Sequence, residues 1–203
     1  MKYRITFINE LYRKGIHLLG ILIPVLYYYT NKRTIMLMLI ALFASSLIFD
    51  ILRIRYKILR FSVFTKLAFD KIFRKHEETN LSGLTYACIG MLISLLLVSE
   101  VIFNLAILIL VISDTSSAIL GKIFGKHELI DHKTFEGSLA FLITSCLISY
   151  FVTIVYDQNY VFLCYAIITS VVATLIELFS KRLHIDDNLS IPLTVSILMK
   201  FLI

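Results

Sequence analysis

The sequence lacks both a long polar stretch and a disulfide framework. Its longest polar segment is 53–80, which leaves no room for a separate soluble catalytic domain, so any active site must be built from helix ends and short loops. The cysteines (Cys88, Cys146 and Cys164) lie within apolar runs without C-x-x-C spacing, which indicates small core residues. The first apolar run has a basic flank but no small-residue cleavage site after it, which favours a retained helix over a signal peptide.

Long apolar runs make up most of the chain instead. Of the 203 residues 59% are hydrophobic and the mean hydropathy is +0.87, whereas a soluble domain is typically about half apolar. Crossing a hydrocarbon core of about 30 Å takes roughly 20 apolar helical residues. We therefore predict an all-α integral membrane protein, a single domain over 1–203 with a bundle of about seven transmembrane helices. The expected helices are 15–30, 34–52, 81–99, 101–120, 138–156, 160–179 and 189–203.

The charged segment 53–78 has a pattern of its own. Apolar residues such as Ile54, Ile58 and Phe61 recur near the helical period, and lysines and arginines stand between them. Such a pattern is typical of an amphipathic helix that lies in the membrane interface. We expect one such helix in addition to the transmembrane bundle.

Basic residues are distributed unevenly over the two faces of the predicted bundle. The formal net charge is +6, and all but three of the 20 Lys and Arg residues fall on the face that holds the N-terminus. The exceptions are Lys32, Arg33 and Lys200. Because loops rich in Lys and Arg stay inside the cell, the N-terminus and this face are predicted to be cytoplasmic. Orientation and contact with anionic headgroups explain the charge better than nucleic-acid binding.

The first polar group on this face is Arg13-Lys14-x-x-His17, at the mouth of the first helix. Arg13 and His17 are four residues apart and share a helical face, so these cationic donors could hold phosphate oxygens. The alternative is that Arg13 and Lys14 only anchor the helix at the membrane surface.

The second polar group is Asp114, which lies inside the predicted helix 101–120. An ionisable group there normally faces a polar cavity or a partner. Ser117, Ala118 and Gly121 continue the face of Asp114, and a stripe of small residues lets another helix or a ligand approach closely. The alternative is a structural Asp paired to a nearby cation.

The third polar group is the loop after this helix, which resembles a P-loop only superficially. Its two glycines are one residue too close, no Ser or Thr follows Lys126, and no strand is expected before it. Helix N-termini bind anions through free N–H groups, and a helix is expected soon after Lys133. The alternative is an ordinary loop with a capping residue. The candidate phosphate-binding residues here are Gly121, Gly125, Lys126, Lys133, Thr134, Glu136, Gly137 and Ser138.

The fourth polar group is acidic. Glu177 lies about one turn inside its predicted helix, and an Asp-Asp-Asn run precedes the last helix. Adjacent carboxylates with an Asn suit a hard cation such as Mg²⁺. The alternative is a solvated loop in which Asn188 or Ser190 caps the last helix and Pro192 lies in its first turn. The candidate Mg²⁺ ligands are Asp114, Asp186, Asp187 and Asn188.

The four groups together suit phosphoryl transfer at a membrane surface, because that chemistry depends on positioning and charge neutralisation. They also resemble motifs of the family of polyprenol (dolichol) kinases, phytol kinases and CTP-dependent diacylglycerol kinases, over about residues 10–194. The Lys-(Ser/Thr)-x-Glu-Gly-Ser and Glu…Asp-Asp-Asn-x-x-Ile-Pro motifs are the most specific. The similar segments are 13–17, 114–125, 133–138 and 177–192, and Asp50 and Arg53 stand where a carboxylate and an arginine often precede the interfacial segment.

This resemblance implies a kinase that moves the γ-phosphate of a nucleoside triphosphate, usually CTP rather than ATP, onto a lipid alcohol in the presence of Mg²⁺. The acceptor classes are polyprenol or dolichol-like alcohols, phytol-like alcohols and diacylglycerol. In this hypothesis Lys133 contacts the phosphates, and a carboxylate, Asp114 first and Glu177 second, orients or deprotonates the lipid hydroxyl. The chain lacks the extra N-terminal helices of eukaryotic dolichol kinases, so it looks like a minimal catalytic core.

Two other functions stay open at this point. A membrane cytidylyltransferase also handles CTP and Mg²⁺, and a small transporter or channel also carries ionisable residues in its spans. The kinase hypothesis requires Asp114, Lys133, Glu177 and the acids of 186–188 to converge on one site at the cytoplasmic face. Whether the chain forms an oligomer is left open.

Overall fold

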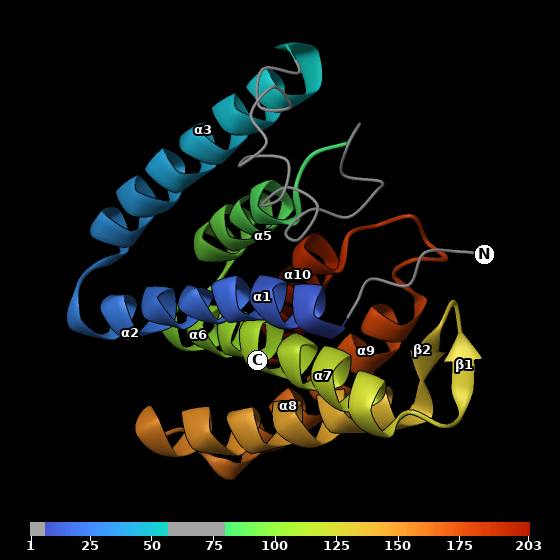
Figure 1. Cartoon of the computed structure of the whole chain (residues 1–203). Helices are drawn as coiled ribbons and strands as arrows, with labels where there is room; N and C mark the ends of the chain where they lie inside the picture. Colours follow the sequence, from blue (N-terminus) through green and yellow to red (C-terminus); the bar gives the residue numbers. More distant parts are fainter. Residues whose placement is uncertain (1–6, 57–79) are drawn as a thin grey trace.

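The computed structural model describes residues 7–56 and 80–203, and Figure 1 shows how they are arranged. They are helical almost throughout, apart from one antiparallel hairpin of two short strands. A 3-10 turn (Leu19–Ile21) joins α1 to α2, and a π-helical segment (Ile109–Ser113) joins α6 to α7. The elements are α1 (Phe7–Leu18), α2 (Leu22–Tyr29), α3 (Lys32–Tyr56), α5 (Gly83–Leu97), α6 (Glu100–Leu108), α7 (Asp114–Phe124), β1 (Glu128–Ile130), β2 (Lys133–Thr134), α8 (Phe135–Val155), α9 (Tyr160–Phe179) and α10 (Asp187–Leu202).

Four helices are long and apolar enough to cross a membrane: α3, the continuous α6–α7 rod, α8 and α9. Helix α5 is also apolar but has 15 residues, and α10 has 16, fewer than the roughly 20 that a straight crossing takes. The 3-10 turn divides the first apolar run into α1 and α2. The prediction of an all-α, multi-pass membrane protein is therefore confirmed, but the number of seven spans is not.

The helix boundaries differ from the predicted ones at three places. The first helix begins at Phe7 rather than near residue 15, because its charged residues face the protein and extend the packed helix. The first residues of the predicted interfacial helix belong to α3, which continues to Tyr56, and the rest of that helix lies outside the described residues. The last helix is capped by Asp186 rather than by Asn188 or Ser190, so Pro192 lies beyond its first turn.

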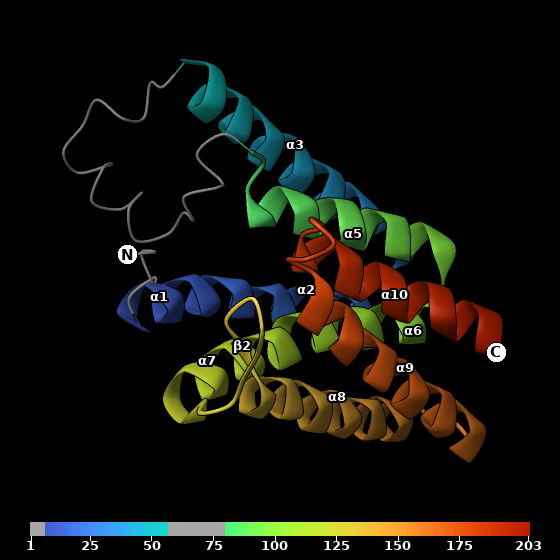
Figure 2. The same ribbon diagram turned by 90° about the vertical axis from the view of Figure 1, so that its right-hand side faces the viewer.

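Helix α6 lies in the core, and its residues 102–107 are all buried. Helix α7 packs against both α1 and α8, and α10 packs against α5, α6 and α9. Helix α3 contacts mainly α5 and α2, and it leans away from the other helices in Figures 1 and 2. The hairpin lies at one end of the bundle, where α7 and α9 end and α8 and α10 begin (Figure 1).

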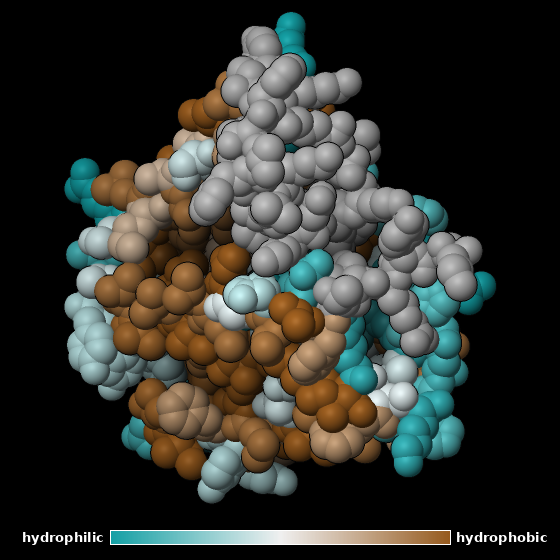
Figure 3. Space-filling model, in the orientation of Figure 1, coloured by the Kyte–Doolittle hydropathy of each residue, from teal (hydrophilic) through white to brown (hydrophobic). Residues whose placement is uncertain are grey.

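Helix α1 has the reverse of the usual amphipathic arrangement. Its charged residues Glu10 and Lys14 are only 7% and 4% exposed, whereas Ile8 and, in the 3-10 turn that follows, Leu19 are more than 60% exposed. A surface helix of a soluble protein turns its apolar side inward. The outward apolar side suits a lipid environment, and Figure 3 shows hydrophobic residues over much of this face, with hydrophilic ones toward the hairpin. The interior polar side of α1 leads to the candidate site.

A polar contact at the opposite end of the bundle joins α6 to α8. Tyr156, just after α8, donates from its hydroxyl to Glu100 Oε1 (3.2 Å) and accepts from the side-chain amide of Asn104. Burial raises the pKa of Tyr156 to about 12, so the hydroxyl keeps its proton at neutral pH. This contact joins the start of α6 to the end of α8.

Candidate functional site

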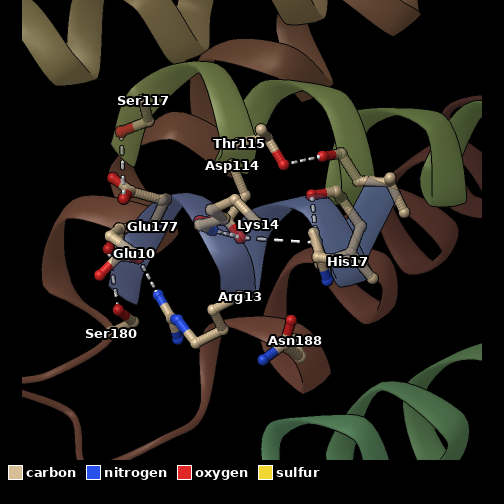
Figure 4. Close-up of polar contacts among 12 residues, drawn as sticks. Glu10, Arg13, Lys14, His17, Asp114, Thr115, Ser117, Glu177, Ser180 and Asn188 are labelled. Carbon is tan, nitrogen blue, oxygen red and sulfur yellow. Dashed lines mark hydrogen bonds and ion pairs between the residues drawn. The ribbon is translucent and has the colours of Figure 1, made fainter. Parts of the chain in front are cut away.

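Asp114 and Lys14 form a buried ion pair between α7 and α1 (Figure 4). Lys14 Nζ donates to Asp114 Oδ2, and both side chains are about 5% exposed. His17, one turn along α1, lies with its Nε2 3.6 Å from the same oxygen and 3.3 Å from the carbonyl oxygen of Leu110. The Leu110 carbonyl belongs to the π-helical segment, and such segments occur frequently at functional sites.

A second ion pair joins Glu177 on α9 to Lys133 on β2. Lys133 Nζ donates to Glu177 Oε1 (2.7 Å), to the backbone carbonyl of Glu177 and to Ser180 Oγ (3.2 Å). Glu177 is 4% exposed, and Ser180 is also buried. The lysine thus satisfies one backbone carbonyl near the C-terminal end of α9 as well as the carboxylate, which gives the hairpin a structural role in addition to any chemical one.

The two ion pairs lie side by side. Ser117, one turn after Asp114 on α7, donates to Glu177 Oε1 (3.4 Å). Helix α7 therefore carries the first carboxylate and contacts the second. Asp114 and Asp187 are also close enough to Glu177 to act on it electrostatically, and Asp187 acts on His17 as well. The structure therefore brings Asp114, Lys133, Glu177 and Asp187 to one place, although they come from four elements far apart in the sequence.

A third carboxylate, Glu10 on α1, is not among the site residues predicted from the sequence. It accepts hydrogen bonds from Arg13 on the same helix and from Lys122 Nζ on α7 (3.3 Å). Arg13 is therefore tied to the protein as well as being a candidate phosphate ligand. Glu10 stands three and four residues before Arg13 and Lys14, so helical spacing could have placed all three on one face.

The glycines of the loop motifs lie where α7 and α8 touch. A Cβ atom on Gly121 would come within 3.2 Å of the Gly137 Cα, and one on Gly137 would come within 3.0 Å of the Ser117 carbonyl oxygen. A Cβ atom on Gly125 would come within 2.7 Å of the Thr134 side chain. These residues allow close helix packing, and their contact with phosphate stays a prediction.

The N-terminal end of α8 is largely satisfied by the protein itself. Thr134 caps the helix by accepting from the Gly137 amide (3.2 Å), and the Phe135 amide donates to the His127 carbonyl (2.9 Å). Glu136 Oε1 lies 2.7 Å from His127 Nδ1, and Lys126 is exposed in the loop. The hydroxyl of Ser138 is buried without a hydrogen-bond partner among the described residues. An anion here would have to compete with these contacts.

The acidic run before α10 is partly used for capping. Asp186 Oδ1 accepts from the Asn188 amide (3.0 Å) and from its side-chain nitrogen (2.8 Å). Over residues 7–56 and 80–203, no three His, Cys, Asp or Glu side chains are grouped so that they could hold a metal ion. Asp114, Asp186, Asp187 and Asn188 thus form no preformed cage. Mg²⁺ is commonly bound by one or two carboxylates plus substrate phosphates, and that mode stays a prediction for Asp114 and Asp187.

A separate buried carboxylate joins α3 to α5. Asp50 is fully buried, and its Oδ1 accepts from Arg53 (2.8 Å). Its Oδ2 accepts from the Ser82 amide (2.8 Å), the Ser82 hydroxyl (2.9 Å) and the Thr85 hydroxyl (2.7 Å). Arg53 also donates to the Asn80 carbonyl (2.8 Å). Both Asp50 oxygens are therefore engaged by the protein.

Two relatives resemble the chain along nearly its whole length. The uncharacterized protein RP860 of Rickettsia prowazekii (strain Madrid E) is 32% identical over 185 residues, which cover 90% of this chain and 89% of the relative. The uncharacterized protein MJ1137 of Methanocaldococcus jannaschii is 31% identical over 195 residues, covering 94% and 93%. No protein-family model matches the chain, and no solved structure gives a significant match.

Proposed function

We propose that this chain, which belongs to the same protein family as the Rickettsia and Methanocaldococcus proteins, is a lipid-alcohol kinase. It transfers the γ-phosphate of a nucleoside triphosphate, CTP in preference to ATP, to the hydroxyl of a polyprenol or dolichol-like, phytol-like or diacylglycerol acceptor. The resemblance of its motifs to that kinase family gives the substrate classes. The proposal includes a cytoplasmic site, because the sequence predicts most of the Lys and Arg residues on the side of the N-terminus.

The observation that carries the proposal is the adjacent placement of two lysine–carboxylate pairs, Lys14–Asp114 and Lys133–Glu177, in the helix ends of an apolar bundle. Ionisable groups in such a place are costly, so they are typically functional. Phosphoryl transfer requires cations to neutralise the phosphates and carboxylates to hold the nucleotide-bound Mg²⁺ and the acceptor hydroxyl. The paired side chains supply both kinds of group.

The ion pairs also suggest how the substrates bind. The triphosphate oxygens compete with Asp114 and Glu177 for Lys14 and Lys133, which frees carboxylate oxygens for the Mg²⁺ carried by the nucleotide and for the lipid hydroxyl. The lipid tail stays in the bilayer, because only the hydroxyl has to reach the helix ends. His17 and Arg13 lie on the same helix as Lys14 and can add donors to the phosphates.

The test is phosphate transfer by the purified protein in detergent or liposomes. It is incubated with a panel of lipid alcohols and with CTP or ATP labelled either at the γ- or at the α-phosphate, and the lipid products are separated. We expect γ-label in the lipid and no α-label. Label from the α-phosphate in the lipid identifies a cytidylyltransferase, and no label from either position in any lipid refutes the kinase.

A further inference from the structure

Glu177 uses only one of its two carboxylate oxygens. Its Oε1 accepts from Lys133 (2.7 Å) and from Ser117 (3.4 Å), whereas its Oε2 is buried and has no hydrogen-bond partner among the described residues. A buried acceptor left unsatisfied costs about 1–3 kcal/mol, and more when it is charged. Such an atom calls for a donor that residues 7–56 and 80–203 do not provide.

The other carboxylate of the site is already occupied. Asp114 Oδ2 accepts from Lys14 and lies 3.6 Å from His17 Nε2, so two side chains of α1 face the oxygen that could otherwise take a substrate proton. Neither Asp114 oxygen is left buried and unsatisfied, in contrast to Glu177 Oε2. The two carboxylates therefore differ in whether an oxygen is left for a substrate.

We propose that Glu177 Oε2 accepts the hydroxyl of the lipid alcohol and acts as its general base, and that Asp114 is a positioning residue that holds Lys14. This inference rests on the proposed kinase function. It places Glu177 before Asp114 as the base, whereas the sequence favours Asp114. Lys133 and Ser117 hold Oε1, so the carboxylate is oriented with Oε2 directed to the acceptor.

The location of Glu177 suits this role. It lies two residues before the end of α9, a helix apolar enough to cross the membrane, so a hydroxyl on a membrane-embedded chain can reach it without pulling the tail into water. Lys133 Nζ contacts the same carboxylate, which places a phosphate ligand within reach of the hydroxyl. Nucleophile and phosphate are thereby brought together, and such positioning supplies much of the catalysis in phosphoryl transfer.

The proposed step balances in atoms and charge. The O–H bond of the alcohol breaks and its proton goes to Glu177 Oε2. The alcohol oxygen forms a bond to the γ-phosphorus, and the bond from that phosphorus to the β,γ-bridging oxygen breaks, with its electron pair leaving on the nucleoside diphosphate. Glu177 returns the proton to solvent or to the departing phosphate groups.

The experiment compares Glu177→Gln with Asp114→Asn in the full-length protein. Gln keeps the shape of the side chain but cannot take a proton, so kcat should fall by about 10²–10⁴-fold, the usual range for a general base. The affinity for a non-hydrolysable nucleotide analogue, measured by titration calorimetry, should change less than threefold. Asp114→Asn should alter KM for the nucleotide more than kcat, because it changes the position of Lys14 and the competition for it without removing the base. Glu100→Gln, at the other end of the bundle, is the matched control and should retain wild-type kcat.

Two further variants keep the result interpretable. Glu177→Asp retains a carboxylate in a withdrawn position and should recover part of the activity lost in Glu177→Gln; Ser117→Ala should lower kcat by a few fold without changing nucleotide affinity. If Glu177→Gln does not fold, the activities of Glu177→Asp and Ser117→Ala test the role of Glu177 instead. A kcat preserved in Glu177→Gln, or lost only in Asp114→Asn, overturns the assignment while leaving the kinase intact. Absence of γ-transfer by the wild type refutes the proposed function itself.

Discussion

Two buried carboxylates in this protein have similar chemistry but different surroundings. Asp50 pairs with Arg53, and Glu177 pairs with Lys133. Asp50 receives hydrogen bonds at both oxygens from groups on α3 and at the start of α5, whereas Glu177 Oε2 has no partner in the described part of the chain. A complete network rigidifies the fold, and an incomplete one marks a place where another molecule can supply the missing group.

The position of each carboxylate supports this difference. Asp50 ties α3, which contacts mainly α5 and α2, to the N-terminal end of α5. Glu177 lies among residues of α7, α9 and β2, at the end of the bundle where several helices begin or end (Figure 1). The Asp50 cluster is expected to determine stability and the Glu177 cluster to determine activity. Three substitutions test this division, in addition to the Glu177 series.

The largest effect is expected for Asp50→Ala. Removing one partner of a buried ion pair leaves the other buried and unpaired, which typically costs about 3–5 kcal/mol. The variant should therefore unfold at a clearly lower temperature in detergent, as followed by circular dichroism. The double variant Asp50→Ala, Arg53→Met should recover part of the loss, because no charge is then left alone. An unchanged unfolding temperature in Asp50→Ala would contradict the structural role of the cluster.

The next effect is expected for Lys133→Met. Loss of the cation should lower kcat for γ-phosphate transfer by about 10²–10³-fold, the range seen when a group that stabilises transition-state charge is removed. Its unfolding temperature should fall less than that of Asp50→Ala, since Met keeps most of the packing. Lys181→Met is the control: Lys181 is exposed and donates to the Asp131 carbonyl of the hairpin (3.2 Å), away from Glu177. Equal losses of activity in both variants would point to hairpin placement rather than to the Lys133 charge.

The smallest effect is expected for Gly121→Ala. The added methyl group would lie 3.2 Å from the Gly137 Cα, so α7 and α8 must separate, and overpacking of this kind typically costs about 1–3 kcal/mol. Gly15→Ala on α1 is the matched control, because no described atom lies within 4 Å of the added carbon. It should be neutral or slightly stabilising through its helix propensity. Thermal unfolding of both variants distinguishes a packing role of Gly121 from a phosphate-binding one, in which activity falls without loss of stability.

The site could be predicted only in part from the sequence. Asp114 and Glu177 were recognised because an ionisable residue inside an apolar run is costly wherever the run lies. Glu10, by contrast, was missed because it precedes the apolar part of its helix, and the Asp186 cap was missed because Asn188 and Ser190 are equally good capping residues. The sequence predicts the partners Lys14 and Lys133 as phosphate ligands, but the ion pairs depend on which helices become neighbours.

An all-α, multi-pass membrane protein can be predicted without coordinates, since apolar runs and helical periods are local properties of the chain. The packing of the helices adds that α1 turns its charges inward, that the glycines bring α7 against α8, and that one Glu177 oxygen has no donor among the described residues. These features depend on contacts between segments that are distant in the sequence, such as Lys14 and Asp114, which are 100 residues apart. Hydrophobicity places a helix in the membrane, but its rotation and neighbours follow from the packing of all the helices together.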